Sequence, residues 1–360
     1  MAPSATSPPA ADTTVDPTVL TLRKTLCSES SPLALRFRAL FSLKHLACIP
    51  DTPSTIPAIE AIAAAFTSPS ALLKHELAYC LGQTRNPAAA PILRSVLEDR
   101  DEDSMCRHEA AEALAALGDE GSLVLLKERR DDDKEVEVVR ETCEIAVDRI
   151  EWEVSEEGKK EKLRQSIFFS HCAKHFAWGF YSLLTTLPFR DFASIDPAPT
   201  IEESKSQSVE KLEEQLLDTK QPLFLRYRAM FGLRDLASPP DLPTAVPAVQ
   251  ALAKGLHDPS ALFRHEIAFV FGQLSHPASI PALTESLSNL EEASMVRHEA
   301  AEALGSLGEE DGVEDILKKF LDDKEQVVRD SVIVALDMAE FEKTGETEYA
   351  LIPENVAAAA

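Results

Sequence analysis

The sequence has few of the residues on which a sheet-built core usually depends. Among 360 residues there are only 12 glycines, and aromatic residues make up 6% of the chain. Alanine and leucine dominate instead, and this balance favours helices over strands. A chain of this length forms either two ordinary domains or one continuous repeat array.

Basic residues are scarce relative to acidic ones. The chain has 36 Lys and Arg against 61 Asp and Glu, a formal net charge of −25 at pH 7. Sequence-independent nucleic-acid binding needs Lys and Arg to neutralise phosphates, so we expect no nucleic-acid partner. The charge suits a basic or amine-bearing partner that is attracted over a long range. A purely solubilising role explains most of these charges equally well.

The sequence also lacks the signs of a secreted protein. None of its six cysteines forms a CxxC pair, and a reducing, cytoplasmic setting, with the nucleus as a second compartment, fits them better than a disulfide framework. Residues 1–17 are rich in Ala, Pro, Ser and Thr, without the basic and apolar regions of a signal peptide. We expect a disordered tail there.

The chain repeats itself at an offset of 190 residues. SPSALLKHELAYCLGQ, from Ser68, returns as DPSALFRHEIAFVFGQ from Asp258. SMCRHEAAEALAALG, from Ser104, returns as SMVRHEAAEALGSLG from Ser294. The chain therefore divides into two homologous halves, residues 18–150 and 207–341, joined by a linker at 151–206. Tails at 1–17 and 342–360 flank them.

A shorter period lies inside each half. Equivalent basic residues, each followed by an apolar stripe at helical spacing, occur at Arg36, Lys74, Arg107 and Arg140. Turn signals such as Asp258-Pro259 separate the stripes. The pattern predicts an all-α fold, an α-solenoid of eight helical hairpins in two symmetric four-repeat halves. It resembles HEAT repeats, in which the second helix of each hairpin lines the concave face.

One apolar segment interrupts the polar linker, at residues 167–190 (IFFSHCAKHFAWGFYSLLTTLPFR). It is roughly long enough to span a bilayer, but His171, Lys174, His175 and Gly179 interrupt it. No flanking signal supports a span, so we expect no membrane insertion. The segment is either a docking element that covers the array, or a retained short intron or lineage-specific insertion.

Histidine is rare, yet it recurs in one setting. Of nine histidines, four are followed by Glu inside near-identical helical frames: His75-Glu76, His108-Glu109, His265-Glu266 and His298-Glu299. A single such pair is usually solvated, but four equivalent pairs are hard to explain in that way. The five other histidines lack this setting and are expected to be structural: His45, His171, His175, His257 and His276.

The four pairs predict two metal half-sites. Neighbouring second helices pack about 8–10 Å apart, so two imidazoles can bind one ion at roughly 2.0–2.2 Å each. The adjacent glutamates point about 100° further round the helix and complete or flank the site. If the halves face each other across a pseudo-two-fold axis, two ions come together. Mixed nitrogen and oxygen ligation suits iron(II) or manganese better than structural zinc. Met105 and Met295, three residues before their histidines, either line this pocket or pack in the core.

The chain resembles the deoxyhypusine hydroxylase family over residues 18–150 and 207–341. The resemblance rests on the motifs KHELAYCLGQ, RHEAAEALAALG, RHEIAFVFGQ and RHEAAEALGSLG, and on SIDPAP at Ser194–Pro199. The segment 167–190 departs from the pattern that we expect of the family. This departure puts the conformation of the linker in doubt, but not the site.

The resemblance implies a monooxygenase that completes hypusine, by hydroxylating the deoxyhypusine side chain of the eukaryotic translation factor that carries it. It implies two iron ions, ferrous in the reduced form, with molecular oxygen as co-substrate and an electron donor that the sequence does not identify. One iron would be bound by His75, His108 and Glu109, and the other by His265, His298 and Glu299. Glu76 and Glu266 would complete the coordination or bind the amine groups of the substrate.

Three other functions are compatible with the repeats. A HEAT-repeat lyase that attaches a tetrapyrrole to a protein would bind no iron and would not need paired His-Glu in both halves. A non-catalytic HEAT-repeat scaffold would bind no metal and would tolerate the loss of His75. A dinuclear metallohydrolase would use two ions to activate water and would work without oxygen.

Overall fold

The computed structural model describes residues 16–161, 194–201 and 207–344. Within these ranges the regular structure is helical throughout and contains no strand. Most of the two predicted tails and all of the 167–190 segment lie outside the described residues. Among the helices that are described, none has the length and apolar character needed to cross a membrane.

The first half consists of four helical hairpins. Their helices are α1 (Pro17–Leu26) and α2 (Leu33–Cys48), α3 (Thr55–Ala63) and α4 (Ala71–Gln83), α5 (Ala90–Glu98) and α6 (Ser104–Ala116), and α7 (Leu123–Arg130) and α8 (Glu137–Val154). Short 3-10 turns continue α3 or precede α5 and α7, at Ala64–Thr67, Pro87–Ala89 and Glu120–Ser122.

The second half has the same order of elements. Its hairpins are α11 (Val209–Leu217) and α12 (Leu223–Leu236), α13 (Ala245–Lys254) and α14 (Ala261–Leu274), α15 (Ile280–Ser288) and α16 (Ser294–Gly305), and α17 (Val313–Leu317) and α18 (Gln326–Thr344). Its 3-10 turns are Gly255–His257, Pro277–Ser279 and Lys318–Phe320. The predicted all-α solenoid of eight hairpins is confirmed. The outermost helices begin and end slightly beyond the expected limits, at Pro17 and Thr344.

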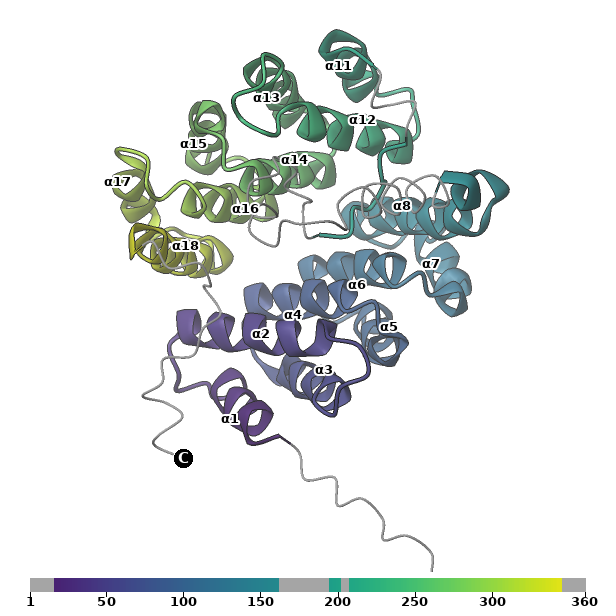
Figure 1. Cartoon of the computed structure of the whole chain (residues 1–360), viewed down its shortest axis with the longest axis vertical. Coiled ribbons are helices and arrows are strands. Elements are labelled where there is room, and N and C mark those ends of the chain that lie inside the picture. The colour runs from purple at the N-terminus through teal and green to yellow at the C-terminus, as the bar shows by residue number, and fades with distance from the viewer. Residues whose placement is uncertain (1–15, 162–193, 202–206, 345–360) are drawn as a thin grey trace, which may run out of the picture.

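The second helices of the hairpins form a closed inner layer. In each half they stack in chain order, α2 to α8 and α12 to α18. The last helix of each half then packs against the other half, α8 on α12 and α14, and α18 on α2 and α4. Figure 1 shows the inner helices of the two halves facing each other, with α1, α3, α5, α7 and their counterparts outside. This closure brings the concave faces of the halves together.

The two seams between the halves are related by the repeat. Ile145 of α8 belongs to the apolar core of the second half, and its counterpart Val334 of α18 belongs to the core of the first. Ser260 donates a hydrogen bond to Glu141 at 2.7 Å, and Ser70 donates one to Asp330 at 3.4 Å. Each half therefore closes the other in the same way, as a pseudo-two-fold axis requires.

Basic residues at one position of the inner helices, half of them buried, connect most of the successive hairpins. The fourth residue of every second helix is Arg or Lys: Arg36, Lys74, Arg107, Arg140, Arg226, Arg264, Arg297 and Arg329. Arg297 shows the pattern, because it donates to the Leu287 carbonyl at 3.0 Å and to both carboxylate oxygens of Asp323 at 3.0 and 2.5 Å. Asp323 lies in the turn before the next second helix. We call these eight residues and their acceptors the Arg ladder.

Small residues allow the inner helices to approach closely. A Cβ atom added to Gly82 of α4 would lie 2.8 Å from the Cα of Ala113 in α6. The equivalent contact in the second half, between Gly272 of α14 and Ala303 of α16, is 3.4 Å, and Gly305 of α16 would come within 2.8 Å of Ala335 in α18. A larger side chain at Gly82 or Gly305 would push neighbouring backbones apart. The close stacking positions the residues that face the axis.

Part of the linker crosses the ends of two inner helices. The backbone N–H of Ile195 donates to Gln83 Oε1 at 2.8 Å, and Gln273 Nε2 donates to Ser194 Oγ at 2.5 Å. Gln83 and Gln273 are equivalent residues, near the ends of α4 and α14. Residues 194–201 are therefore held by both halves at once.

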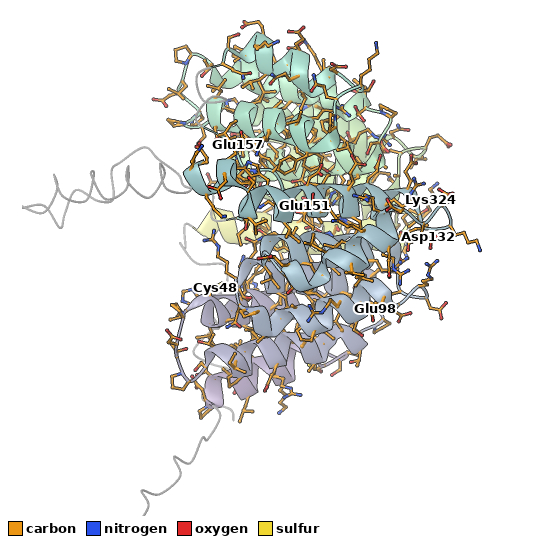
Figure 2. The ribbon with its side chains drawn as sticks, turned by 90° about the vertical axis from the view of Figure 1, so that its right-hand side faces the viewer. Cys48, Glu98, Asp132, Glu151, Glu157 and Lys324 are labelled. Carbon is orange, nitrogen blue, oxygen red and sulfur yellow. The ribbon has the colours of Figure 1, made fainter. Side chains whose placement is uncertain are left out.

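The surface carries much of the negative charge. Glu98, Glu151 and Glu157 are all exposed, and they lie along the side of the molecule that Figure 2 presents. Asp132 on the same side is paired with Arg100. A surface of this kind favours the approach of a cationic partner.

Candidate metal centre

The four histidines of the His-Glu pairs meet in the interior. His75, His108, His265 and His298 are each the fifth residue of an inner helix, α4, α6, α14 and α16. The ring centroids of the five measured pairs lie 5.2 to 5.8 Å apart. Their exposed fractions are 0 to 4%. The duplication thus assembles one four-histidine cluster from two halves, as the sequence predicted.

The nitrogens of these imidazoles lack the partners that burial demands. Both ring nitrogens of His75, His108 and His265, and Nε2 of His298, have no hydrogen-bond partner among the described residues. A buried polar group without a partner costs about 1–3 kcal/mol, and one protein would rarely retain several without a use. Convergent imidazole lone pairs are the donors that divalent transition metals bind. The cluster therefore fits metal ions.

Glutamates of the His-Glu pairs complete the cluster across helices. His75 Nε2 lies 3.3 Å from Glu109 Oε2 on the neighbouring α6. The same contact recurs in the second half, where His265 Nε2 lies 3.4 Å from Glu299 Oε2 on α16. For His75 and His265 the nearest carboxylate thus belongs to the next hairpin.

Three groups of donor atoms lie within 4.8 Å of one another. One group is His75, His108 and Glu109, a ligand set expected for the first half. The others are His75, His265 and His298, and His298, Glu299 and Glu302. The set expected for the second half, His265, His298 and Glu299, does not form one such group. Its members are instead divided between the latter two groups, and His298 belongs to both.

Glu76 and Glu266 occupy different surroundings. Glu76 Oε1 lies 3.7 Å from Nδ1 of its neighbour His75, and its side chain is 11% exposed. Glu266 is 2% exposed, and its Oε1 has no hydrogen-bond partner among the described residues. An unpaired buried carboxylate oxygen is available to a ligand or to a cation. Glu76 contacts the four-histidine cluster and Glu266 follows one of its histidines in the chain, and the roles of both stay predictions.

Burial and mutual repulsion govern protonation in the cluster. Burial lowers the pKa of His265 to about 3, and it lowers those of His108 and His298 with help from neighbouring imidazoles. For His75, burial also disfavours the charge, but Glu109 and Glu76 outweigh it and raise the pKa. Burial raises the pKa of Glu299 to about 8. Most of the imidazoles are therefore neutral, which is the form that binds metal.

Several residues near the cluster were missed in the sequence. Glu112 and Glu302 follow His108 and His298 by one helical turn, and burial raises the pKa of each. Both stand at the same place in the duplicated motif HEAAEAL, so the repeat did contain the signal. The Tyr227 hydroxyl is also buried and has no hydrogen-bond partner among the described residues. Tyr227 is the fifth residue of its inner helix, the position that histidine takes in α14 and α16.

The two methionines and the five other histidines singled out in the sequence lie in different parts of the molecule. Met105 and Met295 are 6% and 9% exposed and belong to the apolar core of the second half, so a contact with substrate stays a prediction for both. His45 and His257 are exposed. His276 caps a 3-10 turn, where its Nδ1 accepts from the Ala278 N–H at 3.1 Å. His171 and His175 lie outside the described residues.

Comparisons with known proteins agree with this architecture. A family model described as HEAT repeats matches residues 56–148 and 249–337. Deoxyhypusine hydroxylase of Aspergillus fumigatus is 67% identical over 358 residues, 98% of this chain and 100% of the relative. That of Phaeosphaeria nodorum is 69% identical over 347 residues, 96% and 98% of the two chains. The structure of human deoxyhypusine hydroxylase in complex with glycerol has 42% identity and a TM-score of 0.71, over 90% of this chain and 96% of the human one.

Proposed function

Because the chain belongs to the deoxyhypusine hydroxylase family, we propose that it is an enzyme that hydroxylates the deoxyhypusine side chain of a protein substrate. The observation that carries the chemistry is the cluster of four buried imidazoles whose nitrogens lack partners. We propose that this cluster binds two iron ions and that molecular oxygen is the co-substrate. The substrate would be the eukaryotic translation factor that contains deoxyhypusine.

The proposed ligands follow the two halves. His75, His108 and Glu109 would hold one ion, in agreement with the proximity of their donor atoms. His265, His298 and Glu299 would hold the other, with His298 close to donors of both halves. When bound, the iron pair would supply the activation of oxygen: one oxygen atom would convert a C–H bond of the substrate to C–OH, and the other would be reduced to water by two electrons from an external donor and two protons.

The residues around the ions would orient the substrate and exclude water. Deoxyhypusine is a long side chain with amine nitrogens, which are cationic near neutral pH. Glu266, which has an unpaired buried oxygen, and Glu76, which lies beside His75, would bind those nitrogens. A nearby cation favours the ionised form of a carboxyl. The low exposure of the imidazoles keeps bulk water from the reacting carbon.

The acidic surface would assist the encounter with substrate. A net charge of −25 attracts a basic loop over a distance of about 8 Å at physiological ionic strength. Raised salt should therefore slow association more than it slows the chemical step. A cytoplasmic location would place the enzyme with its substrate, and fractionation of cells tests this point.

The deciding experiment counts iron and follows the oxygen atom. The purified chain should contain about two irons per monomer, and it should add one oxygen atom to a deoxyhypusine-containing protein. With labelled oxygen gas, the label should enter the product. A metal-dependent activity that persists without oxygen would favour the metallohydrolase, and a metal-free chain that remains active would overturn the proposed function.

A matched pair of variants separates the metal centre from the fold. His108→Ala removes a buried imidazole of the cluster, whereas His45→Ala removes an exposed one. Only the first should lower the iron content and the activity. Equal behaviour of the two variants would contradict the assignment of His108 as a ligand.

A further inference from the structure

Two residues outside the expected ligand set face the outer edge of His298. Ser331 Oγ on α18 lies 3.5 Å from His298 Nδ1, and it donates a hydrogen bond to Glu302 Oε1 at 2.8 Å. That same Glu302 oxygen lies 3.5 Å from His298 Nδ1. His298 and Ser331 are both 0% exposed. The Nδ1 edge of this imidazole is therefore enclosed by two oxygen atoms.

The direction of the serine hydrogen bond decides whether Ser331 presents a donor or an acceptor to Nδ1 of His298. Because the Ser331 proton points to Glu302, the serine oxygen presents lone pairs to His298. Both neighbours of Nδ1 are thus acceptors, and they favour the tautomer in which Nδ1 carries the proton. Nε2 then keeps its lone pair, and this atom has no hydrogen-bond partner among the described residues. His298 also belongs to the group of donor residues that includes His75 and His265.

The first half lacks this arrangement. The counterparts of Glu302 and Ser331 are Glu112 and Thr142. Thr142 Oγ1 donates to the Val138 carbonyl at 2.7 Å, inside its own helix. Neither nitrogen of His108 has a hydrogen-bond partner in the described part of the chain. The turn before α18 is one residue shorter than the turn before α8, so the two last helices are not connected in the same way to the hairpins that precede them.

We propose that Glu302 and Ser331 are positioning residues that hold His298 for metal binding, and that the ion at His298 is consequently bound more tightly than the ion at His108. The inference rests on the proposed metal centre. Partners of this kind fix the ring orientation and raise the basicity of the binding nitrogen. Losing such a partner typically costs 10–100-fold in metal affinity. The duplicated chain thus contains two unequal ion sites.

The test titrates the full-length, metal-free chain with cobalt(II) under anaerobic conditions. Visible absorption and calorimetry give the two dissociation constants, independently of enzyme activity. The wild-type chain should bind two ions in separable steps. Glu302→Gln should weaken the tighter step by about 10-fold or more, and Ser331→Ala should weaken the same step to a smaller extent.

The first half provides the matched controls. Glu112→Gln and Thr142→Ala change the equivalent residues, and they should leave the tighter step unchanged. Equal weakening by Glu112→Gln and Glu302→Gln, or two indistinguishable steps in the wild type, would overturn the proposal. A wild-type chain that binds no ion would instead overturn the proposed function.

A second measurement needs no metal. Nitrogen NMR of the imidazoles in the metal-free chain reports which nitrogen carries the proton. His298 should be protonated at Nδ1, and Ser331→Ala should change that signal while the helical circular dichroism remains the same. An Nε2-protonated His298 in the wild-type chain would contradict the proposed role of Glu302 and Ser331. Ser331→Ala removes a single oxygen atom, so it keeps the test available if Glu302→Gln folds poorly.

Discussion

Two regions of the molecule differ in whether their buried polar side chains have hydrogen-bond partners, and two adjacent residues of one helix show the difference. Arg297 and His298 of α16 are both 0% exposed. Arg297 belongs to the Arg ladder, where the Leu287 carbonyl and the Asp323 carboxylate accept its hydrogen bonds. Nε2 of His298 faces the four-histidine cluster without a partner in the described chain. One helical step of about 100° separates a satisfied polar group from an unsatisfied one.

The difference distinguishes buried side chains that stabilise the fold from buried side chains that are available to a ligand. A buried charge is retained when its partners are built into the fold, and the Arg ladder supplies them from successive turns. Arg107, which donates to Glu135 at 2.8 Å, repeats the pattern in the first half. Its neighbour His108 again has two unpartnered nitrogens. Several buried nitrogens without partners that come together, as in the four-histidine cluster, indicate where a ligand binds.

The largest effect should come from the cluster. His298→Ala should lower hydroxylation by more than about a hundredfold, because it removes a proposed ligand shared by two donor groups. The fold should persist, because stacking of repeats supplies most of the stability. Turnover and thermal unfolding, measured on the same preparation, check both statements. An active variant would remove His298 from the proposed centre.

Loss of an Arg-ladder residue should lower the stability of the fold, whereas loss of a cluster histidine should lower activity. Arg297→Ala leaves Asp323 as a buried carboxylate without its partner, and the expected loss is about 3–5 kcal/mol in the free energy of unfolding. Replacing both members, as Arg297→Met with Asp323→Leu, should recover much of that loss. Urea unfolding of the three proteins tests this order. If Arg297→Ala unfolds as the wild type does, the ladder has no structural role.

Metal removal should affect the cluster and leave the ladder intact. Ions bound between the halves stabilise the folded state by about 2.7 kcal/mol at a concentration of 100 times their dissociation constant. A chelator should therefore lower the unfolding temperature of the wild-type chain more than that of His298→Ala, which retains the ligands proposed for only one ion. An equal decrease in both proteins would indicate that the chelator acts elsewhere.

Acid should weaken the ladder through its carboxylates. The hydrogen bond from Arg297 lowers the pKa of Asp323 below its usual 3.8. A carboxyl with a lowered folded-state pKa stabilises the fold above its unfolded pKa, and this contribution is lost as the pH falls through the folded value. The difference in unfolding free energy between wild type and Asp323→Asn should thus be constant near neutrality and shrink below about pH 3.8. A difference that grows in acid would contradict the ion pair.

The repeated motifs made much of this structure predictable. Helical spacing and the 190-residue offset placed His75 and His265 at equivalent positions on second helices, and the fold confirmed both the hairpins and the meeting of the histidines. Glu302 was less visible, because its spacing from His298 also suits a solvent-facing helix position. Ser331 lies in another hairpin, and no local pattern relates it to His298.

The sequence by itself determined the helices and the set of candidate metal ligands, because helical periodicity and the repeated His-Glu motifs can be read directly from the order of residues. The tertiary structure decided which donors face one another. His75 meets Glu109 on the next helix, and His298 is enclosed by Glu302 and Ser331 while His108 has no such neighbours. Such contacts depend on how far each helix is rotated against its neighbour and on how the two halves close, and packing of the whole chain alone sets those quantities.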